Sequence, residues 1–468
     1  MYERTRGLLA GKTVFGLALA ACTGTGSVLD PPTPPTTPPF TTFDVLEVRG
    51  ITATLHPVIG SIVVVDWIQN RPAEVHAEFS FDAGIWVSSP VASVPAGPGQ
   101  ALLLGIPYGT DTTWRLVAAD GPTVFNSPDA VVRNADLPAA QLVGTLRVAD
   151  PNAYDADGAP WLFTSLAGTN NFYEPWHNVV IDRLGRVVWA LRSPQQRVSI
   201  HSRVARDGRS LYLDRNSYWA IFDVEASTID QMRIDGSVIH TFDVPGLHHP
   251  FTDLPDGSVA WGATTGGYAN EYLNVVHADG SVETVLDCME WMRTIGQDGF
   301  CMSNTLSYDE GTDTLLLSEF STETLVAVNR TTGAVDRWYG AAVGSWAFEP
   351  SESQFYWQHG GYVTEAGTLL TSSDRTARGD ETIVREYAFD AVNHALVEIW
   401  NFGIGEGVYG GQMGEAVRLP NGNTLHNYGE LARLREATPD KVVVWDIEWD
   451  SYAIGRSMPV ADLYALAP

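Results

Sequence analysis

Alternating apolar and polar residues, interrupted by short polar turns, run through most of the chain after about residue 160. The clearest turns are three copies of Asp-Gly-Ser-Val, at 235–238, 256–259 and 279–282, and looser copies occur at 182–189, 332–335, 366–370 and 420–425. Asp-Gly and Asn-Gly favour tight hairpin turns in which both residues take positive φ. The spacing therefore predicts a repeated β-hairpin, and hairpins repeated over this length predict a β-propeller around a central channel.

A separate pattern of short apolar strands, bounded by Pro and Gly, occupies residues 43–140. Strands are expected at 62–67, 75–81, 101–104 and 114–119. The segment 103–117 resembles the late-strand region of fibronectin type III domains, and the length suits a small sandwich. We therefore expect an all-β chain, with a fibronectin-like β-sandwich over 43–140 and the propeller over 141–468.

The first 22 residues have a basic start, a short apolar core and small residues directly before Cys22. This pattern resembles a bacterial lipoprotein signal, which implies that Cys22 is lipidated and becomes the mature N-terminus. The alternative is an ordinary secretory signal with an incidental cysteine. Residues 23–42 are rich in Pro and Thr and are expected to form an extended linker. The protein is thus expected to be exported and lipid-anchored to the cell envelope, and Thr23 resembles the residue of lipoproteins sent to the outer membrane.

The formal charge of −28 argues against a nucleic acid or an anionic membrane surface as partner. An anionic substrate would need a local cluster of Arg and His. The remaining cysteines, Cys288 and Cys301, are expected to form a disulfide across one loop in an oxidising compartment. No His-rich or Cys-x-x-Cys cluster accompanies them, so no metal site is expected.

Polar segments between the hairpins carry the candidate chemistry. They are His248-His249 before a strand, the segment 301–309 with Asn304, the segment Trp357-Gln358-His359, and the segment 419–425. Their order and intervals resemble the bacterial arylsulfate sulfotransferase family over residues 161–447. The resemblance implies a six-bladed propeller that moves a sulfuryl group from a phenolic sulfate ester to a phenol, without metal, nucleotide or other cofactor.

The resemblance also assigns roles. The family's nucleophilic histidine matches His359, its His-His segment matches His248 and His249, with His249 as the functional member, and its active-site asparagine matches Asn304. The implied partners are small aromatic sulfates and phenols, with membrane contact through the lipid anchor alone.

Two positions depart from the family pattern. A family histidine falls on Met302, and a family arginine falls near Glu319 and Phe320. Sulfuryl transfer spreads negative charge over three oxygens, so it needs cationic or N–H donors there. Arg375 and Arg378, which follow His359 by about one strand, are candidates to supply the missing charge; the alternative is that both are solvated loop residues. His177 and His201 are expected to be structural.

Other exported propellers fit less well. A quinoprotein dehydrogenase would show repeated Trp-docking motifs and a vicinal cysteine pair, and a sialidase would show several Asp-box turns, of which only residues 80–86 give a hint. The remaining alternative is a non-catalytic binding propeller derived from the sulfotransferase family. The departures at two site positions favour it, and the presence of His359 and His249 opposes it.

Overall fold

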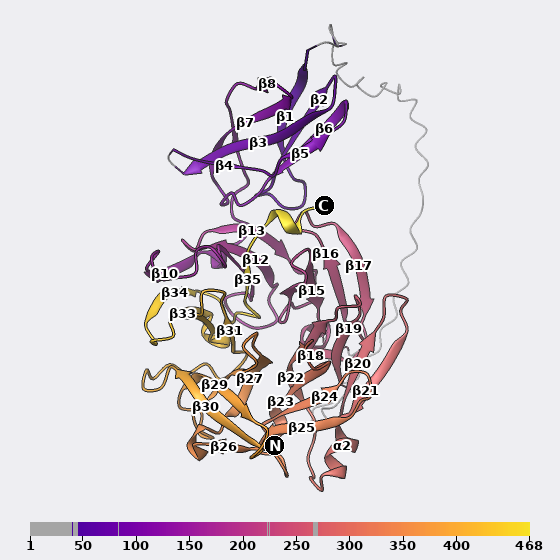
Figure 1. Cartoon of the computed structure of the whole chain (residues 1–468), viewed down its shortest axis with the longest axis vertical. Helices are drawn as coiled ribbons and strands as arrows, with labels where there is room; N and C mark the ends of the chain where they lie inside the picture. Colours follow the sequence, from indigo (N-terminus) through magenta and orange to yellow (C-terminus); the bar gives the residue numbers. More distant parts are fainter. Residues whose placement is uncertain (1–39, 41–44, 83, 222, 224, 265–269) are drawn as a thin grey trace, which may run out of the picture. The chain divides into compact units, whose positions relative to one another are not determined.

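The computed structural model describes residues 40, 45–82, 84–221, 223, 225–264 and 270–468, coloured in Figure 1. The expected lipidation site Cys22 and the signal before it lie outside the described residues, as does nearly all of the expected linker. The described α-helices are short, α1 (Tyr218–Ile221) and α2 (Cys288–Thr294). None of the described helices is long and apolar enough to cross a membrane.

The strands β1 to β9 form two sheets in the N-terminal part of the described chain. One is β1 (Val48–Leu55), β2 (Val63–Gln69) and β6 (Gly97–Leu103). The other is β4 (Ile85–Ser88), β3 (Ala73–Asp82), β7 (Asp111–Asp120) and β8 (Thr123–Asn126), with β5 (Ala92–Val94) on β3 and β9 (Ala130–Arg133) on β7. Alternate residues of β3 and β7 are buried, and their side chains pack with those of β2 in one apolar core that includes Trp67, Phe79 and Trp114.

The later strands form a β-propeller, and Figure 1 shows its sheets as a ring. Three sheets have four strands joined consecutively in antiparallel order. They are β14 (Arg203–Val204), β15 (Leu211–Arg215), β16 (Thr228–Met232) and β17 (Val238–Asp243); β18 (Leu247–Asp253), β19 (Val259–Thr264), β20 (Glu271–Val276) and β21 (Val282–Asp287); and β22 (Ser303–Asp309), β23 (Thr314–Glu319), β24 (Thr324–Asn329) and β25 (Val335–Gly340).

The next two sheets each carry an extra outer strand. The first is β27 (Tyr356–Val363), β28 (Leu369–Asp374), β29 (Thr382–Asp390), β30 (Ala395–Phe402) and β26 (Ala347–Glu349), in which β26 runs parallel to β30. The second is β31 (Glu415–Arg418), β32 (Thr424–Asn427), β33 (Arg433–Ala437), β34 (Val443–Trp449) and β10 (Gly144–Ala149).

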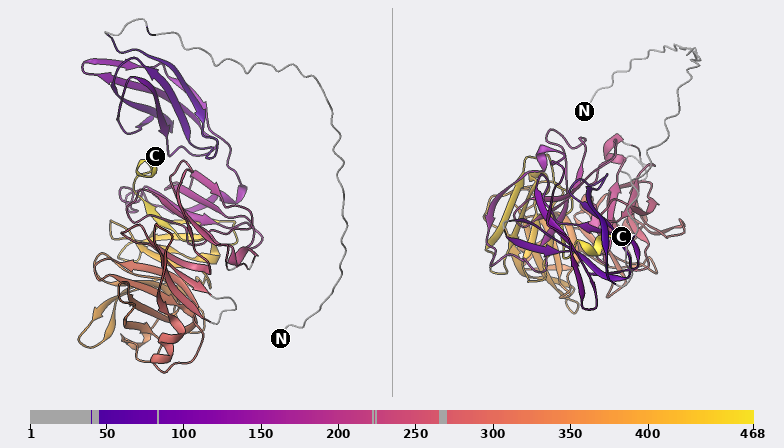
Figure 2. Two further views of the ribbon diagram at one scale, coloured as in Figure 1. Left: turned by 90° about the vertical axis from the view of Figure 1, so that its right-hand side faces the viewer. Right: turned by 90° about the horizontal axis from the view of Figure 1, so that it is seen from above.

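The ring closes by pairing the two ends of the propeller. In the last sheet, β35 (Met458–Val460) near the C-terminus joins β11 (Trp161–Leu166), which continues to β12 (His177–Asp182) and β13 (Val187–Arg192). The yellow C-terminal segment accordingly lies beside the purple strands in Figures 1 and 2. Each sheet therefore buries both faces against its neighbours, as in the shared core of Tyr212 and Ile229 with Phe251 and Trp261.

The Asp-Gly turns differ in one respect from the sequence prediction. Gly236, Gly257 and Gly280 take φ of +87°, +80° and +83°, but the aspartates before them do not have positive φ. Instead the Asp235 carboxylate accepts a hydrogen bond from the backbone N–H of Ser237 at 2.9 Å, and the other two turns repeat this contact. The prediction that both turn residues take positive φ was wrong, because the aspartate stabilises the turn through its side chain.

The disulfide expected between Cys288 and Cys301 is confirmed, with 6.0 Å between the two Cα atoms. It links the first residue of α2 to the segment that enters β22. That segment continues directly into Met302 and Asn304, so the disulfide holds the chain just before two of the positions that the sequence analysis singled out.

Candidate active site

The inner strand of each propeller sheet begins at the same end of the ring, and the polar segments of interest lie at these beginnings. Neighbouring inner strands contact one another, β14 with β35, β18 with β22, β22 with β27 and β27 with β31. His249, Asn304 and His359 lie at or near the starts of β18, β22 and β27. Strands far apart in the sequence thus bring the three residues together.

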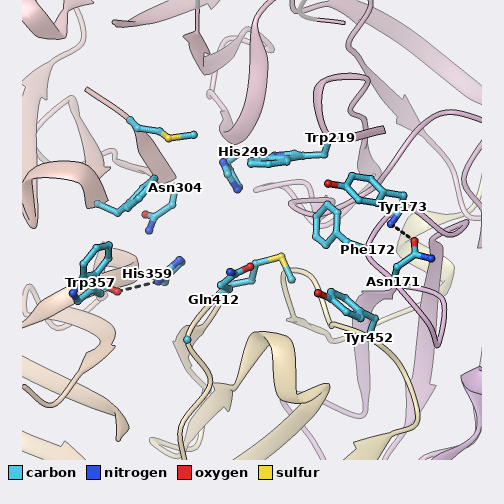
Figure 3. A pocket seen from close by; sticks show the side chains of 14 residues that line it. Asn171, Phe172, Tyr173, Trp219, His249, Asn304, Trp357, His359, Gln412 and Tyr452 are labelled. Carbon is cyan, nitrogen blue, oxygen red and sulfur yellow. Dashed lines mark hydrogen bonds between the residues drawn. The ribbon is translucent and has the colours of Figure 1, made fainter. Parts of the chain in front are cut away.

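These three side chains line one cavity of about 410 Å³, shown in Figure 3. Most of the other lining side chains are aromatic or methionine, and none of the described lining residues is Arg, Lys, Asp or Glu. The remaining lining residues are Asn171, Phe172, Tyr173, Trp219, Met302, Phe320, Trp357, Gly411, Gln412, Met413 and Tyr452. The cavity is therefore suited to an aromatic ligand.

His359 sits on an irregular part of β27. The pairing of β27 with β28 shifts register on both sides of His359, and Trp357 takes a φ of +49°. Gly360 follows with a φ of +68°, and a Cβ atom there would lie 2.5 Å from the Cβ of Glu415. The Trp-Gln-His-Gly segment is thus a bulge that leans against β31 and directs the imidazole into the cavity (Figure 3).

The imidazole of His359 is held in one tautomer. Its Nδ1 lies 3.0 Å from the carbonyl oxygen of Trp357, and because a carbonyl only accepts, Nδ1 carries the proton. Nε2 then keeps its lone pair. Burial lowers the pKa of His359 to about 4, so the ring is neutral at neutral pH. A neutral imidazole with a free Nε2 is the form that can act as a nucleophile.

His249 and His248 point in different directions from β18. The half-buried His249 ring faces the cavity, with its centroid 5.0 Å from that of Trp219. Burial, together with nearby histidines, holds the pKa of His249 well below its usual value. His248 is fully buried, its Nε2 lies 3.6 Å from Oε2 of Glu271, and burial lowers its pKa to about 4. His249 is therefore the member of the pair that can reach a ligand.

Asn304 is tied to the histidine segment. Its Nδ2 donates to the backbone carbonyl of Gln358 at 2.8 Å, and the backbone N–H of Gly360 donates to the hydroxyl of the neighbouring Thr305 at 3.0 Å. These two bonds hold β22 and the His359 bulge at a fixed separation. Asn304 thus positions His359 as well as lining the cavity.

The two departures from the family pattern lie in and under the cavity. Met302 and Phe320 line it, whereas Glu319 is completely buried, and neither of its carboxylate oxygens has a hydrogen-bond partner among the described residues. Burial and the nearby charge of Glu271 hold the pKa of Glu319 well above its usual value. The described structure therefore has no cation at these positions.

Arg375 and Arg378 do not line this cavity. Arg375 forms an ion pair with Glu381 at 2.7 Å, and Arg378 lies exposed in the turn before β29. The expectation that they supply charge to the site receives no support from the geometry, because Glu381 holds Arg375 in its own loop.

Two further groups lie beside His359: Arg456, which the sequence analysis did not single out, and His201, which it expected to be structural. His201 and Arg456 line a small void of about 10 Å³ together with His359, Glu415 and Asn427. The ring of His201 lies edge-on to that of His249, at 5.8 Å between centroids, and Nε of Arg456 lies 3.3 Å from Oε2 of Glu415. Both residues come just before an inner strand, β14 and β35, and this position in the repeat was the signal that could have identified them.

The carboxylate of Asp214 holds the backbone of His201. Oδ1 of the buried Asp214 accepts from the backbone N–H of His201 at 3.2 Å and from the hydroxyl of Ser202 at 2.7 Å. Burial, and then the charge of Arg456, hold the pKa of His201 well below its usual value. His177, by contrast, is buried in β12 and does not line the cavity.

Among the described residues, one group of potential metal ligands occurs near the site. The sulfurs of Cys288 and Cys301 and a carboxylate oxygen of Glu319 lie within 4.8 Å of one another. Because the two sulfurs are bonded to each other, they offer no thiolate to a metal ion.

No family model matches the chain, and no curated protein matches it in sequence. Solved structures do match in part. A protein of unknown function from Bacteroides caccae is 13% identical, with a TM-score of 0.43 over 65% of this chain and 100% of that chain. Streptogramin B lyase is 11% identical, with a TM-score of 0.37 over 69% of this chain and 99% of that chain. The calcium-binding protein regucalcin from Agrobacterium tumefaciens is 13% identical, with a TM-score of 0.33 over 69% of this chain and 94% of that chain.

Proposed function

We propose that the protein transfers a sulfuryl group from a phenolic sulfate ester to a phenol, with His359 as the group carrier. The observation that carries the proposal is the locked tautomer of His359, whose Nε2 faces an aromatic cavity while Nδ1 donates to the Trp357 carbonyl. A neutral imidazole of this kind needs no separate base before it attacks sulfur.

In the first half of the reaction, Nε2 of His359 attacks sulfur and the bond between sulfur and the phenolic oxygen breaks. The phenolate leaves with that electron pair, accepts a hydrogen bond from His249 and is protonated by solvent. The positive charge that forms on the imidazole is delocalised to the Nδ1–H, which already donates to Trp357.

In the second half, the oxygen of an acceptor phenol attacks sulfur. The bond between sulfur and Nε2 breaks, and its electron pair returns to the imidazole. The acceptor gives its proton to His249, which passes it to solvent. His249 suits this role because its low pKa keeps it neutral and able to accept a proton.

The negative charge on the sulfuryl oxygens needs stabilising groups, and we propose that the guanidinium of Arg456 and an N–H of the neutral His201 ring supply them. Both line the small void next to His359, whereas Met302 and Phe320 line the larger cavity. Because the Arg456 side chain is mostly buried, its guanidinium acts more strongly than it would in water. In this proposal, Arg456 and His201 replace the family histidine and arginine that are absent from the cavity wall.

The test is incubation of the purified protein with a chromogenic aryl sulfate and a second phenol. We expect release of the chromophore and appearance of the acceptor sulfate and, when the second phenol is left out, a sulfuryl adduct on the peptide that contains His359, detected by mass spectrometry under neutral conditions. His359→Gln, which keeps a hydrogen-bonding side chain but lacks the nucleophile, is the matched control and is expected to abolish all three signals.

A second candidate function is non-catalytic binding of an aromatic ligand. The observation that favours it is the replacement of two expected charge-stabilising groups by Met302 and Phe320 in the cavity wall. Saturable binding of the aryl sulfate without turnover or adduct in the same incubation would support this candidate and exclude the transferase.

The finer architecture and the location of the protein belong to the same proposal. The sheets from β10 onward are the blades of a six-bladed propeller, and the N-terminal sheets are a fibronectin-like sandwich that positions it. Cys22 carries the lipid that anchors the protein to the outside of the cell. Cys22→Ser is expected to move the protein from the membrane fraction to the soluble fraction, and unchanged partition would contradict the anchor.

A further inference from the structure

Three aromatic side chains of the cavity are largely exposed to solvent. Trp357, Tyr452 and Tyr173 are 46%, 48% and 56% exposed, and all three line the same cavity. Large aromatic residues that stay open to solvent around one cavity indicate a binding surface, because a folded chain normally buries them.

These side chains form two groups on opposite sides of the histidines. In Figure 3, Trp357 lies on the His359 side, while Phe172, Tyr173 and Tyr452 lie on the other side. His249 and Gln412 lie between the two groups. The first group also includes Phe320, whose ring centroid lies 6.4 Å from that of Trp357.

The group around Phe172 is rigid. The ring of Phe172 packs edge-on against Trp176 and Trp219, at 5.2 and 6.0 Å between centroids. Trp176 and Trp219 are fixed in turn by indole hydrogen bonds, to the carbonyl of Phe172 at 2.9 Å and to the carbonyl of His248 at 2.6 Å. A wall held in this way is preorganised, so a ring that stacks on it loses little affinity to reordering of the protein.

The group around Trp357 is strained and directly coupled to the nucleophile. A bulky residue with a φ of +49° is an outlier that the surrounding structure must hold in place. The same residue lines the cavity, and its carbonyl accepts the hydrogen bond from Nδ1–H of His359. A ligand stacked on Trp357 would therefore lie next to the imidazole.

We propose that the cavity has two aryl subsites that can be occupied at the same time. One is formed by Trp357 and Phe320, the other by Phe172, Trp219 and Tyr452, and Nε2 of His359 lies between them. The volume of the cavity, about 410 Å³, lies within the range that accommodates drug-sized ligands. This is more space than one phenyl ring requires.

This inference rests on the proposed function, because one subsite would hold the sulfate donor and the other the acceptor phenol. It implies that the acceptor can bind before the first phenol has left. The sulfuryl group would then remain on His359 only briefly, and water would have little time to hydrolyse it.

The probe is 4-fluorophenol, which is neutral and carries no sulfuryl group, observed by ¹⁹F NMR with the full chain. Two bound environments are expected for the wild-type protein and for His359→Gln, because binding needs no covalent step. Trp357→Ala should remove one environment and Tyr452→Ala the other, with affinity at the affected subsite at least about tenfold weaker. Trp86→Ala on β4, an exposed Trp that does not line the cavity, is the control and should keep both.

A single bound environment in the wild-type protein overturns the inference without reference to any variant. Loss of both environments in each single variant would also overturn it, since that result describes one shared site. The outcome is separable from the proposed function. If two environments are found but no sulfuryl transfer, the protein is a binding protein with two subsites. If transfer is found with one environment, the protein is a transferase with a single subsite.

Discussion

Nδ1 of His359 lies 3.0 Å from the carbonyl oxygen of Trp357, the residue two positions earlier on the same strand. This contact is possible because Trp357 takes a φ of +49° and the strand bulges on both sides of His359. The strained bulge therefore sets both the direction of the imidazole and the nitrogen that carries its proton. The consequences can be measured.

The pH dependence of sulfuryl uptake should reflect the lowered pKa of His359. Burial lowers this pKa to about 4, so the reactive neutral form persists well below the usual histidine range. We expect the rate of adduct formation, measured by rapid quench with excess aryl sulfate, to stay flat from about pH 8 to about pH 5.5. A rate that halves near pH 6.5 would show that the nucleophile titrates as an ordinary exposed histidine.

Arg456→Gln should slow sulfuryl transfer, because it removes the proposed positive charge behind His359. Loss of one such stabilising group typically costs about 3 kcal/mol of transition-state stabilisation, or roughly a hundredfold in kcat. The measurement is kcat and KM with a chromogenic aryl sulfate. Arg375→Ala is the matched control and should leave kcat unchanged, because Arg375 pairs with Glu381 outside the cavity. Equal losses in both variants would contradict the assignment.

Met302→His should raise the rate of transfer. Met302 lines the cavity, so an imidazole there would place a new donor near the sulfuryl oxygens. An increase in kcat of about tenfold is expected, and Met302→Leu, which keeps the volume without adding a donor, should not reproduce it. A lower kcat for Met302→His than for Met302→Leu would indicate that no charge develops on this side of the cavity.

Glu319→Gln should stabilise the protein more as the pH rises. The unfolded state releases the Glu319 proton near pH 4.5, whereas burial and Glu271 keep the folded state protonated well above that value. The folded state then binds the extra proton, so its stability falls with rising pH until the folded pKa is reached. Glutamine does not titrate, so Glu319→Gln avoids this loss. The free energy of unfolding of Glu319→Gln relative to that of wild type should therefore grow by about 1.4 kcal/mol per pH unit above about pH 5.

Urea unfolding of wild type and Glu319→Gln at several pH values measures this difference. Glu365→Gln, at an exposed glutamate in a turn, is the control and should show no growing advantage. A difference between Glu319→Gln and wild type that is the same at every pH would mean that Glu319 is ionised in the folded protein.

Several features of this protein were determined by the sequence alone. The Asp-Gly-Ser-Val repeats predicted the hairpins of the propeller, because the aspartate and glycine of each turn act within four residues. The spacing of Cys288 and Cys301 predicted their disulfide for the same local reason. The family resemblance selected His249, Asn304 and His359, which the folded chain brings to one cavity.

The tertiary structure decided which charged and polar groups lie beside His359. Arg375 follows His359 closely in the sequence, yet Glu381 holds it in its own loop. Arg456 and His201 are separated by most of the propeller, and they meet because β35 closes the ring beside β11 while β14 begins the next sheet. Local patterns predict turns and strands because their interactions are short-range, whereas the composition of a channel depends on the closure of the whole ring, which no local pattern contains.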